Sequence, residues 1–178
     1  MSCRWLSAKC RMLFLRTRHE PGRPPPLQPP RKVRPGSVFR AGTGAGHRRE
    51  VFMQPFVCAP TRSTPEVHFD AASHRHRMKG ECYPENAAAF FGPLFTWVKA
   101  YLAAKPAGPV VFDLELVYFN SSSSKALLDL FEILERAAAS GTNITVNWRY
   151  DKDNDIACEC GEEFAEDAKA LIFTLLAL

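Results

Sequence analysis

Four consecutive serines between Asn120 and Lys125 are the residues of this sequence best placed for regulatory chemistry. They are Ser121, Ser122, Ser123 and Ser124. Residues 110–119 before them are rich in β-branched and aromatic side chains, and apolar residues recur at helical spacing over 126–139. The serines are therefore predicted to lie where a strand ends and a helix begins, with all four hydroxyls exposed. Free N–H groups and the positive end of the helix dipole favour an anion there, so a hydroxyl can cap the helix, bind a phosphate or become phosphorylated.

The cysteines point to free thiols. The sequence contains Cys3, Cys10, Cys58, Cys82, Cys158 and Cys160. The apolar run at 12–15 is too short for a secretory signal, so we expect a reducing compartment. Cys158 and Cys160 lack a second cysteine pair, which argues against zinc. A small thiol or hydrolytic enzyme is the disfavoured alternative, because no nucleophile, base and orienting group can be identified together; we predict no catalytic residues.

Two further patterns resemble metal sites but are incomplete. Positions 1, 3, 5 and 12 of a calcium loop are filled by Asp151, Asp153, Asp155 and Glu162. Ile156, however, stands where that loop needs glycine. The other pattern comprises His68, His74 and His76, for which no fourth ligand is evident. We predict no metal and no cofactor: the first pattern indicates a solvated acidic loop and the second an exposed basic edge strand over 74–79.

Charge divides the chain into two unlike parts. Residues 1–50 hold 12 of the 23 Lys/Arg and 2 of the 19 Asp/Glu, so the remainder carries a net charge of −6. The first part is rich in arginine and proline and lacks apolar periodicity, so residues 1–52 are predicted to be a disordered leader. A nucleic-acid-binding arm and a transit peptide are disfavoured alternatives. Because Met53 opens the first stretch of ordinary composition, we also consider that translation of the native protein starts there.

Residues 53–178 are predicted to form one α/β domain. Strands are expected at 64–70, 74–79, 110–119, 144–150 and 171–173, with helices after Asn86, over 126–139 and over 162–170. Pro93 should kink or restart the first helix, and Gly141 should cap the second. On the third strand, Tyr118 is expected to share the buried face. The strand–helix–strand unit over 110–150 implies parallel pairing, so the fold class is a mixed sheet of four to five strands with helices packed on it. No apolar run is long enough for a membrane span.

Several separated motifs resemble the SiaC family, small bacterial biofilm-regulating phosphoproteins with a fold similar to STAS domains. They are STPEV with FD (63–70), GECYPEN (80–86), YFNSSSSKALLD (118–129), and VNWRYD with GEEF (146–164). The likeness covers about residues 53–173 and implies a single STAS-like domain. Residues 1–52 have no counterpart in the family.

The resemblance implies a non-enzymatic, cytoplasmic partner switch. In that family a Ser/Thr protein kinase phosphorylates the first hydroxyl residue after the Asn, and a PP2C-type phosphatase removes the phosphate. The unmodified form binds a diguanylate cyclase and promotes cyclic-di-GMP synthesis. By this correspondence Ser121, in place of the usual threonine, is the predicted phosphoacceptor, with Ser122, Ser123 and Ser124 as alternatives and as capping and partner-binding residues. Asn120 and Lys125 are expected to shape the turn. Nucleic acid is not an expected partner. The alternative function is that of an anti-sigma-factor antagonist.

Overall fold

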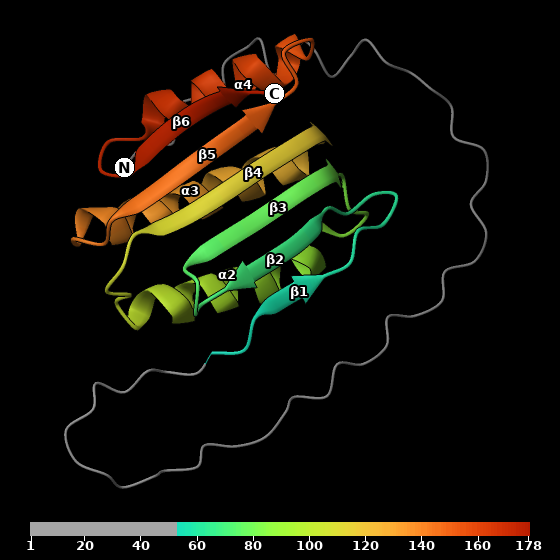
Figure 1. The fold of residues 1–178 in the computed structure, drawn as a ribbon. Coiled ribbons are helices and arrows are strands. Elements are labelled where there is room, and N and C mark those ends of the chain that lie inside the picture. The colour runs from blue at the N-terminus through green and yellow to red at the C-terminus, as the bar shows by residue number, and fades with distance from the viewer. Residues whose placement is uncertain (1–52) are drawn as a thin grey trace, which may run out of the picture. The chain divides into compact units, whose positions relative to one another are not determined.

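The computed structural model describes residues 53–178, which form a six-stranded sheet with helices packed on one face (Figure 1). The strands are β1 (Phe56–Cys58), β2 (Glu66–Asp70), β3 (Arg75–Cys82), β4 (Val110–Phe119), β5 (Ile144–Tyr150) and β6 (Ile172–Ala177). The helices are α2 (Ala87–Ala103), α3 (Ser121–Ala139) and α4 (Asp155–Asp167). The predicted leader, residues 1–52, lies outside the described residues, and a start of translation at Met53 stays a prediction. None of the described helices is long and apolar enough to cross a membrane.

The strands follow one another across the sheet in chain order, and the sheet is mixed. β1, β2 and β3 pair antiparallel, whereas β3, β4, β5 and β6 pair parallel through the crossover helices. The predicted α/β domain with a mixed sheet is confirmed, as is the parallel pairing of β4 with β5. The sheet has six strands because β1 contributes three residues, too few to show a periodic pattern in the sequence.

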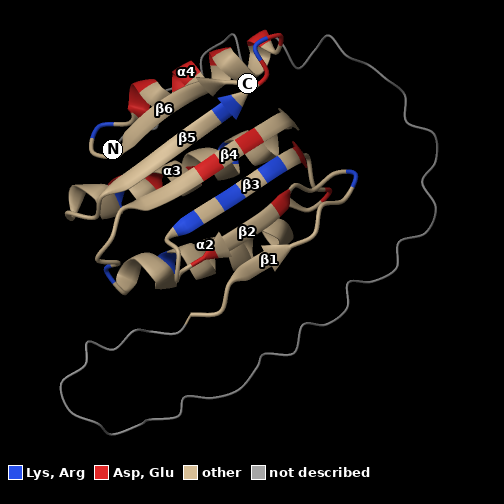
Figure 2. Cartoon of the chain, viewed as in Figure 1, with Lys and Arg blue, Asp and Glu red and all other residues tan. Residues whose placement is uncertain are grey.

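Strand β3 was predicted at an edge of the sheet, and this prediction is wrong. It lies between β2 and β4. Its polar residues alternate with buried ones, so they lie on the face of the sheet that the helices leave uncovered, here called the open face. Figure 2 shows the basic positions along β3 in blue. His76 and Met78 project into the core on the other face and are fully buried. A sheet covered on one side accepts such polar alternation in an internal strand.

His76 lies in a cage of aromatic rings beneath helix α2. The ring centroids nearest to it belong to Phe112 at 4.5 Å, Tyr101 at 4.7 Å, Phe69 at 5.4 Å and Trp97 at 5.5 Å. Neither ring nitrogen has a hydrogen-bond partner among the described residues. Burial lowers the pKa of His76 from its ordinary 6.5 to about 3. His76 is therefore a neutral core residue at physiological pH.

Helix α2 begins after Asn86 and α3 ends at Ala139, as predicted, but α3 begins at Ser121 rather than at residue 126. Asn86 caps α2 by accepting the N–H of Ala89 at 2.9 Å. The helix continues through Pro93 to Ala103, so the restart considered at this proline does not occur. Helix α3 is followed by Gly141 with φ of +100°, as predicted for a C-terminal cap.

Helix α4 begins earlier than predicted. Its N-terminus is capped by Asn154, whose side chain accepts the N–H of Ala157 at 3.1 Å, so the second half of the predicted acidic loop is helical. Trp148 of β5 packs on this helix and donates its ring N–H to the Ala157 carbonyl at 2.8 Å. A Cβ atom at Gly161 would lie 2.5 Å from the Trp148 ring, so only glycine permits this close approach. Gly161, the first residue of the GEEF motif, therefore has a packing role.

Candidate functional site

The serine cluster forms the first turn of α3, directly after β4, as predicted. The cap is Asn120, because its side-chain oxygen accepts the N–H of Ser123 at 2.9 Å. The first helical hydrogen bond runs from the Ser124 N–H to the Asn120 carbonyl at 2.8 Å. The prediction that serine hydroxyls cap this helix is therefore wrong, and they are not needed for that role.

The four serines divide into two accessible and two buried residues. Ser121 and Ser122 are exposed, whereas Ser123 is 0% and Ser124 3% exposed. Ser123 and Ser124 precede buried Leu127 by four and three residues, so they share the face of α3 that packs on the sheet. The expectation that all four hydroxyls are exposed is wrong for this pair. The described structure presents only Ser121 and Ser122 to a partner or a kinase.

Cys82, at the end of β3, lies beneath this turn. Burial raises the pKa of its thiol to about 11, although the neighbouring Ser123 hydroxyl opposes the shift. A thiol with this pKa is protonated at neutral pH and is a poor nucleophile. The geometry therefore gives no support to Cys82 as the nucleophile of a thiol enzyme.

A β-bulge beside the serines exposes apolar side chains. Gly80 of β3 pairs with Leu116 and Glu81 pairs with Tyr118, so Val117 is the extra residue on β4. The alternation reverses at this point: Phe119 is buried and Tyr118 is 46% exposed. The prediction that Tyr118 lies on the buried face is wrong, because a period of two cannot continue through an inserted residue.

Three exposed residues and the half-buried Tyr83 form a small apolar surface near the bulge, at the C-terminal ends of the strands that α3 and α4 follow. We call it the rim patch; it consists of Tyr83, Val117, Tyr118 and Ile156. The rings of Tyr83 and Tyr118 contact edge to face at 5.5 Å. Val117 is 58% and Ile156 52% exposed, and the side chain of Asn154 ties α4 to β4 by donating to the Val117 carbonyl at 3.1 Å. Sequence reasoning missed this surface, since its only signal was the glycine in the GECYPEN motif.

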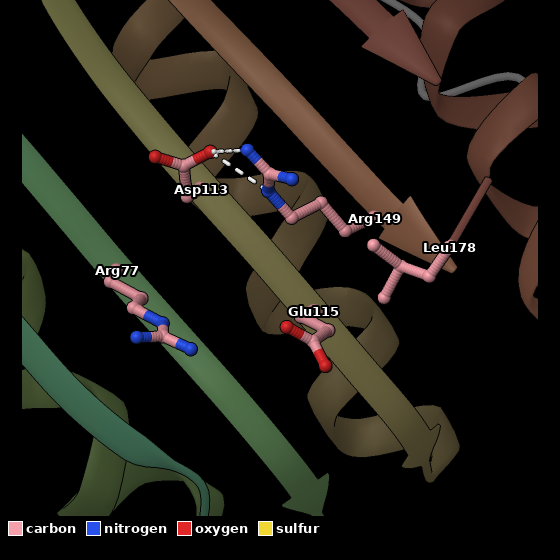
Figure 3. Close-up of a pocket in the computed structure, with 5 residues that line it drawn as sticks. All are labelled: Arg77, Asp113, Glu115, Arg149 and Leu178. Atoms are coloured by element: carbon pink, nitrogen blue, oxygen red, sulfur yellow. Dashed lines mark hydrogen bonds and ion pairs between the residues drawn. The ribbon is translucent and has the colours of Figure 1, made fainter. Parts of the chain in front are cut away.

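The open face of the sheet carries a second grouping of chemically capable residues. A hollow of about 250 Å³ is lined by Arg77, Asp113, Glu115, Arg149 and Leu178 (Figure 3). Asp113 pairs with Arg149 at 3.0 Å and also accepts from the side chain of Asn147 at 3.0 Å. Glu115 pairs with Lys79 at 2.9 Å. Both carboxylates thus have cationic partners across the strands, and the hollow is a cross-strand charge network rather than a catalytic constellation.

The histidines and acidic residues do not form a metal site within residues 53–178. No group of three or more His, Cys, Asp or Glu side chains in this part of the chain is arranged to hold a metal ion. His74 instead bonds through Nδ1 to the Tyr101 hydroxyl at 2.7 Å, and His76 is enclosed by aromatic rings. Helix α4 begins at Asp155, within the predicted acidic loop.

Comparison with known proteins identifies the family of this chain. The model of the SiaC family regulatory phosphoproteins matches residues 58–178. The chain belongs to the SiaC family. An uncharacterised protein of Pseudomonas aeruginosa (strain UCBPP-PA14) is 40% identical over 107 residues, which are 60% of this chain and 84% of that protein.

Solved structures agree with membership of the SiaC family. The crystal structure of apo-SiaC from P. aeruginosa has a TM-score of 0.66 and 37% identity, covering 70% of this chain and 100% of that chain. A chain in the crystal structure of the diguanylate cyclase SiaD in complex with its activator SiaC, from the same organism, has a TM-score of 0.65. It is 36% identical, and the match covers 69% of this chain and 99% of that chain. The family resemblance inferred from the sequence motifs is confirmed.

Proposed function

We propose that this SiaC family member is a non-enzymatic partner switch that acts in the cytoplasm to control biofilm formation. With Ser121 unmodified it binds a diguanylate cyclase and promotes cyclic-di-GMP synthesis. A Ser/Thr protein kinase phosphorylates Ser121 and releases the cyclase, and a PP2C-type phosphatase restores binding. The observation that carries the proposal is the complex of P. aeruginosa SiaC with the cyclase that it activates, at 36% identity to this chain.

Accessibility supports Ser121 as the phosphoacceptor. Ser121 is exposed at the first position of α3, next to the capping residue Asn120. A phosphate there meets the positive end of the helix dipole, which stabilises negative charge. Ser122 is the accessible alternative. A kinase could reach the hydroxyls of Ser123 and Ser124 only after the first turn of α3 had unwound, because both are buried.

The effect on the partner follows from desolvation. A phosphoserine carries roughly −1.5 to −2 charges at neutral pH. The fold accommodates this charge on the exposed side of α3, but a partner that covers Ser121 must remove the dianion from water without compensation. Since about 1.4 kcal/mol changes an affinity tenfold, even a few kcal/mol of this cost releases a complex of ordinary strength.

The partner-binding surface in this proposal joins the first turn of α3 to the rim patch. Asn120, Ser122 and Lys125 supply its polar contacts, and the aromatic and aliphatic side chains of the rim patch supply its apolar centre. Ser123 and Ser124, also predicted to touch the partner, contribute by packing this turn against the sheet.

Cyclase stimulation by matched variants tests the proposal. Ser121→Ala should stimulate the cyclase normally and resist inactivation by the kinase, and Ser121→Glu should stimulate it poorly. Ser140→Ala and Ser140→Glu, at the exposed C-terminal end of α3, are the matched controls and should stimulate the cyclase normally. Phosphopeptide mapping of the kinase-treated protein identifies the modified hydroxyl. Normal stimulation by phosphorylated protein would refute the switch. Copurification of an anti-sigma kinase in place of a cyclase would favour the anti-sigma-factor antagonist instead.

A further inference from the structure

The outer edge of the sheet at β6 is unpaired in the described part of the chain. β6 is the last strand in the sheet order and pairs only with β5 among the described strands (Figure 1). Its sequence, IFTLLA, contains no charged residue and no proline. Exposed edges of this kind are sites at which another chain can add a strand, and natural proteins usually protect them with charge or proline. This edge has neither protection.

The pairing with β5 shows which backbone groups are available. Leu178, directly after β6, donates its N–H to the Tyr150 carbonyl at 2.9 Å. Backbone groups of successive residues in a strand point to opposite sides. The N–H and C=O groups of Phe173, Leu175 and Ala177 therefore point away from β5, toward the free edge. An added strand would use these three residues and would not disturb the existing pairing.

The charge of helix α4 indicates which kind of strand can bind at the free edge of β6. α4 packs against β6 and carries six carboxylates with no lysine or arginine: Asp155, Glu159, Glu162, Glu163, Glu166 and Asp167. Figure 2 shows this acidic helix beside the uncharged β6. Among the described residues, no salt bridge joins any of these carboxylates to a basic side chain. The negative charge is therefore available to a basic partner and repels an acidic one.

The same charge argues against a second copy of this chain as the occupant. Two copies joined edge to edge through β6 would bring two α4 helices to one junction. Each contributes six carboxylates and no cation, so like charges would oppose the pairing. The uncharged edge and the acidic helix are instead complementary to a segment that supplies its own positive charge.

We propose that the free edge of β6, with acidic α4 beside it, binds an extended basic segment of a partner protein as a seventh strand of the sheet. Main-chain hydrogen bonds to Phe173, Leu175 and Ala177 hold the strand, and lysine or arginine side chains of the partner face α4. This surface does not include Ser121, and it shares with the rim patch only helix α4, on which Ile156 lies. A partner bound there leaves the first turn of α3, which carries Ser121, free for the kinase or the cyclase.

Amide hydrogen exchange of the full chain, measured by NMR, tests the proposal. The probe is a synthetic peptide of about ten residues, alternating valine with lysine. The amides of Phe173, Leu175 and Ala177 should exchange at least about tenfold more slowly with the peptide, whereas that of Leu176, already directed at β5, should not change. A peptide with glutamate in place of lysine should give no protection. Binding without protection of the three amides, or equal binding of the glutamate peptide, would overturn the proposal.

Two charge variants separate the role of α4 from net charge. Glu162→Gln, Glu163→Gln and Glu166→Gln together should weaken peptide binding at least about fivefold at low salt and reduce its salt dependence. The matched control removes three carboxylates elsewhere, by Glu66→Gln, Glu85→Gln and Asp129→Asn, and should bind within about twofold of the unsubstituted chain. Equal weakening by both sets would refute the assignment to α4. If the three amides are already protected in free protein, with dimers in sedimentation, a second copy occupies the edge and the proposal is wrong.

Discussion

Removing the buried imidazole of His76 should abolish a large part of the acid sensitivity of this protein. His76 is surrounded by four aromatic rings, and its ring nitrogens have no hydrogen-bond partner in the described chain. Burial is the main cause of its lowered pKa; the nearby charge of His74 acts in the same direction and that of Asp70 in the opposite one. Protonation in the folded state therefore requires a cation to be held in an apolar cage.

The sign and size of the effect follow from linkage. The pKa is about 3 in the folded state and 6.5 when unperturbed, so the unfolded chain binds the proton first as pH falls. The free energy of unfolding is unaffected by His76 above pH 6.5, and it decreases as pH falls from 6.5 toward 3. At about 1.4 kcal/mol per pH unit, the loss is about 2.5 kcal/mol at a pH near 4.5 and at most about 5 kcal/mol in total.

Urea unfolding at pH 7 and near pH 4.5 measures this loss. For His76→Phe, which keeps an aromatic ring of similar size, the decrease between the two pH values should be smaller than for the unsubstituted chain by about 2.5 kcal/mol. His68→Gln, at an exposed position on β2, is the matched control. Comparing the two decreases in the free energy of unfolding removes the contribution of the carboxylates, which both proteins share. It also removes any difference in packing that is already present at pH 7. Equal decreases for His76→Phe and the unsubstituted chain would refute the argument that His76 is buried as a neutral group.

Three further predictions concern residues that position the serine turn and the β6 edge. Glu135 of α3 accepts the backbone N–H groups of Lys169, Ala170 and Leu171 at 3.1, 2.6 and 3.2 Å, so Glu135→Ala should lower the free energy of unfolding by about 1–3 kcal/mol. Glu132→Ala, which removes only an exposed ion pair with Arg136, should change it by less than about 0.5 kcal/mol, and equal effects would contradict this assignment. Gly161→Ala should lower the free energy of unfolding by about 1–3 kcal/mol, because the added methyl group meets the Trp148 ring, and it should shift the fluorescence of Trp148. An unchanged midpoint of urea unfolding would show that the ring moves aside freely. Asn120→Ala should lower the free energy of unfolding by about 1 kcal/mol through loss of the cap, whereas Ser121→Ala should leave it within about 0.5 kcal/mol; the reverse order would identify Ser121 as the cap.

The alternation of β4 and β5 and the apolar stripe of α3 could be predicted because each has one buried face. Phe112, Leu114 and Leu116 are buried on β4, and Ile144, Val146 and Trp148 on β5. In these elements the spacing of apolar residues in the sequence matches the spacing of buried residues in the structure. The spacing therefore predicted both the type of element and the face that it buries. The parallel pairing then followed from the length of the crossover helix.

The errors occurred where the pattern depends on contacts distant in sequence. β3 is polar at every second position, and the sequence does not show that β2 and β4 both pair with it. The bulge at Val117 reverses the side chains that follow, and its partner Gly80 lies more than thirty residues earlier in the chain. Tyr118 was therefore placed in the core although it belongs to the rim patch.

The serine turn was located correctly but its exposure was not. The position of a strand end and a helix start is local information, so the sequence was sufficient to place Ser121. Which of the four hydroxyls is accessible depends on the rotation of α3 about its axis, and this is set by the packing of Leu127 and Leu130 on the sheet. Counting back by helical spacing from Leu127 would have indicated that Ser123 and Ser124 point inward.

The affinity of the protein for its diguanylate cyclase, measured calorimetrically before and after stoichiometric phosphorylation of Ser121, tests the central claim most directly. The account predicts that phosphorylation weakens binding by at least about a hundredfold, equivalent to about 2.7 kcal/mol, while circular dichroism shows the fold unchanged. Treatment with the phosphatase should restore the original affinity. Equal affinities for the modified and unmodified protein would contradict the account.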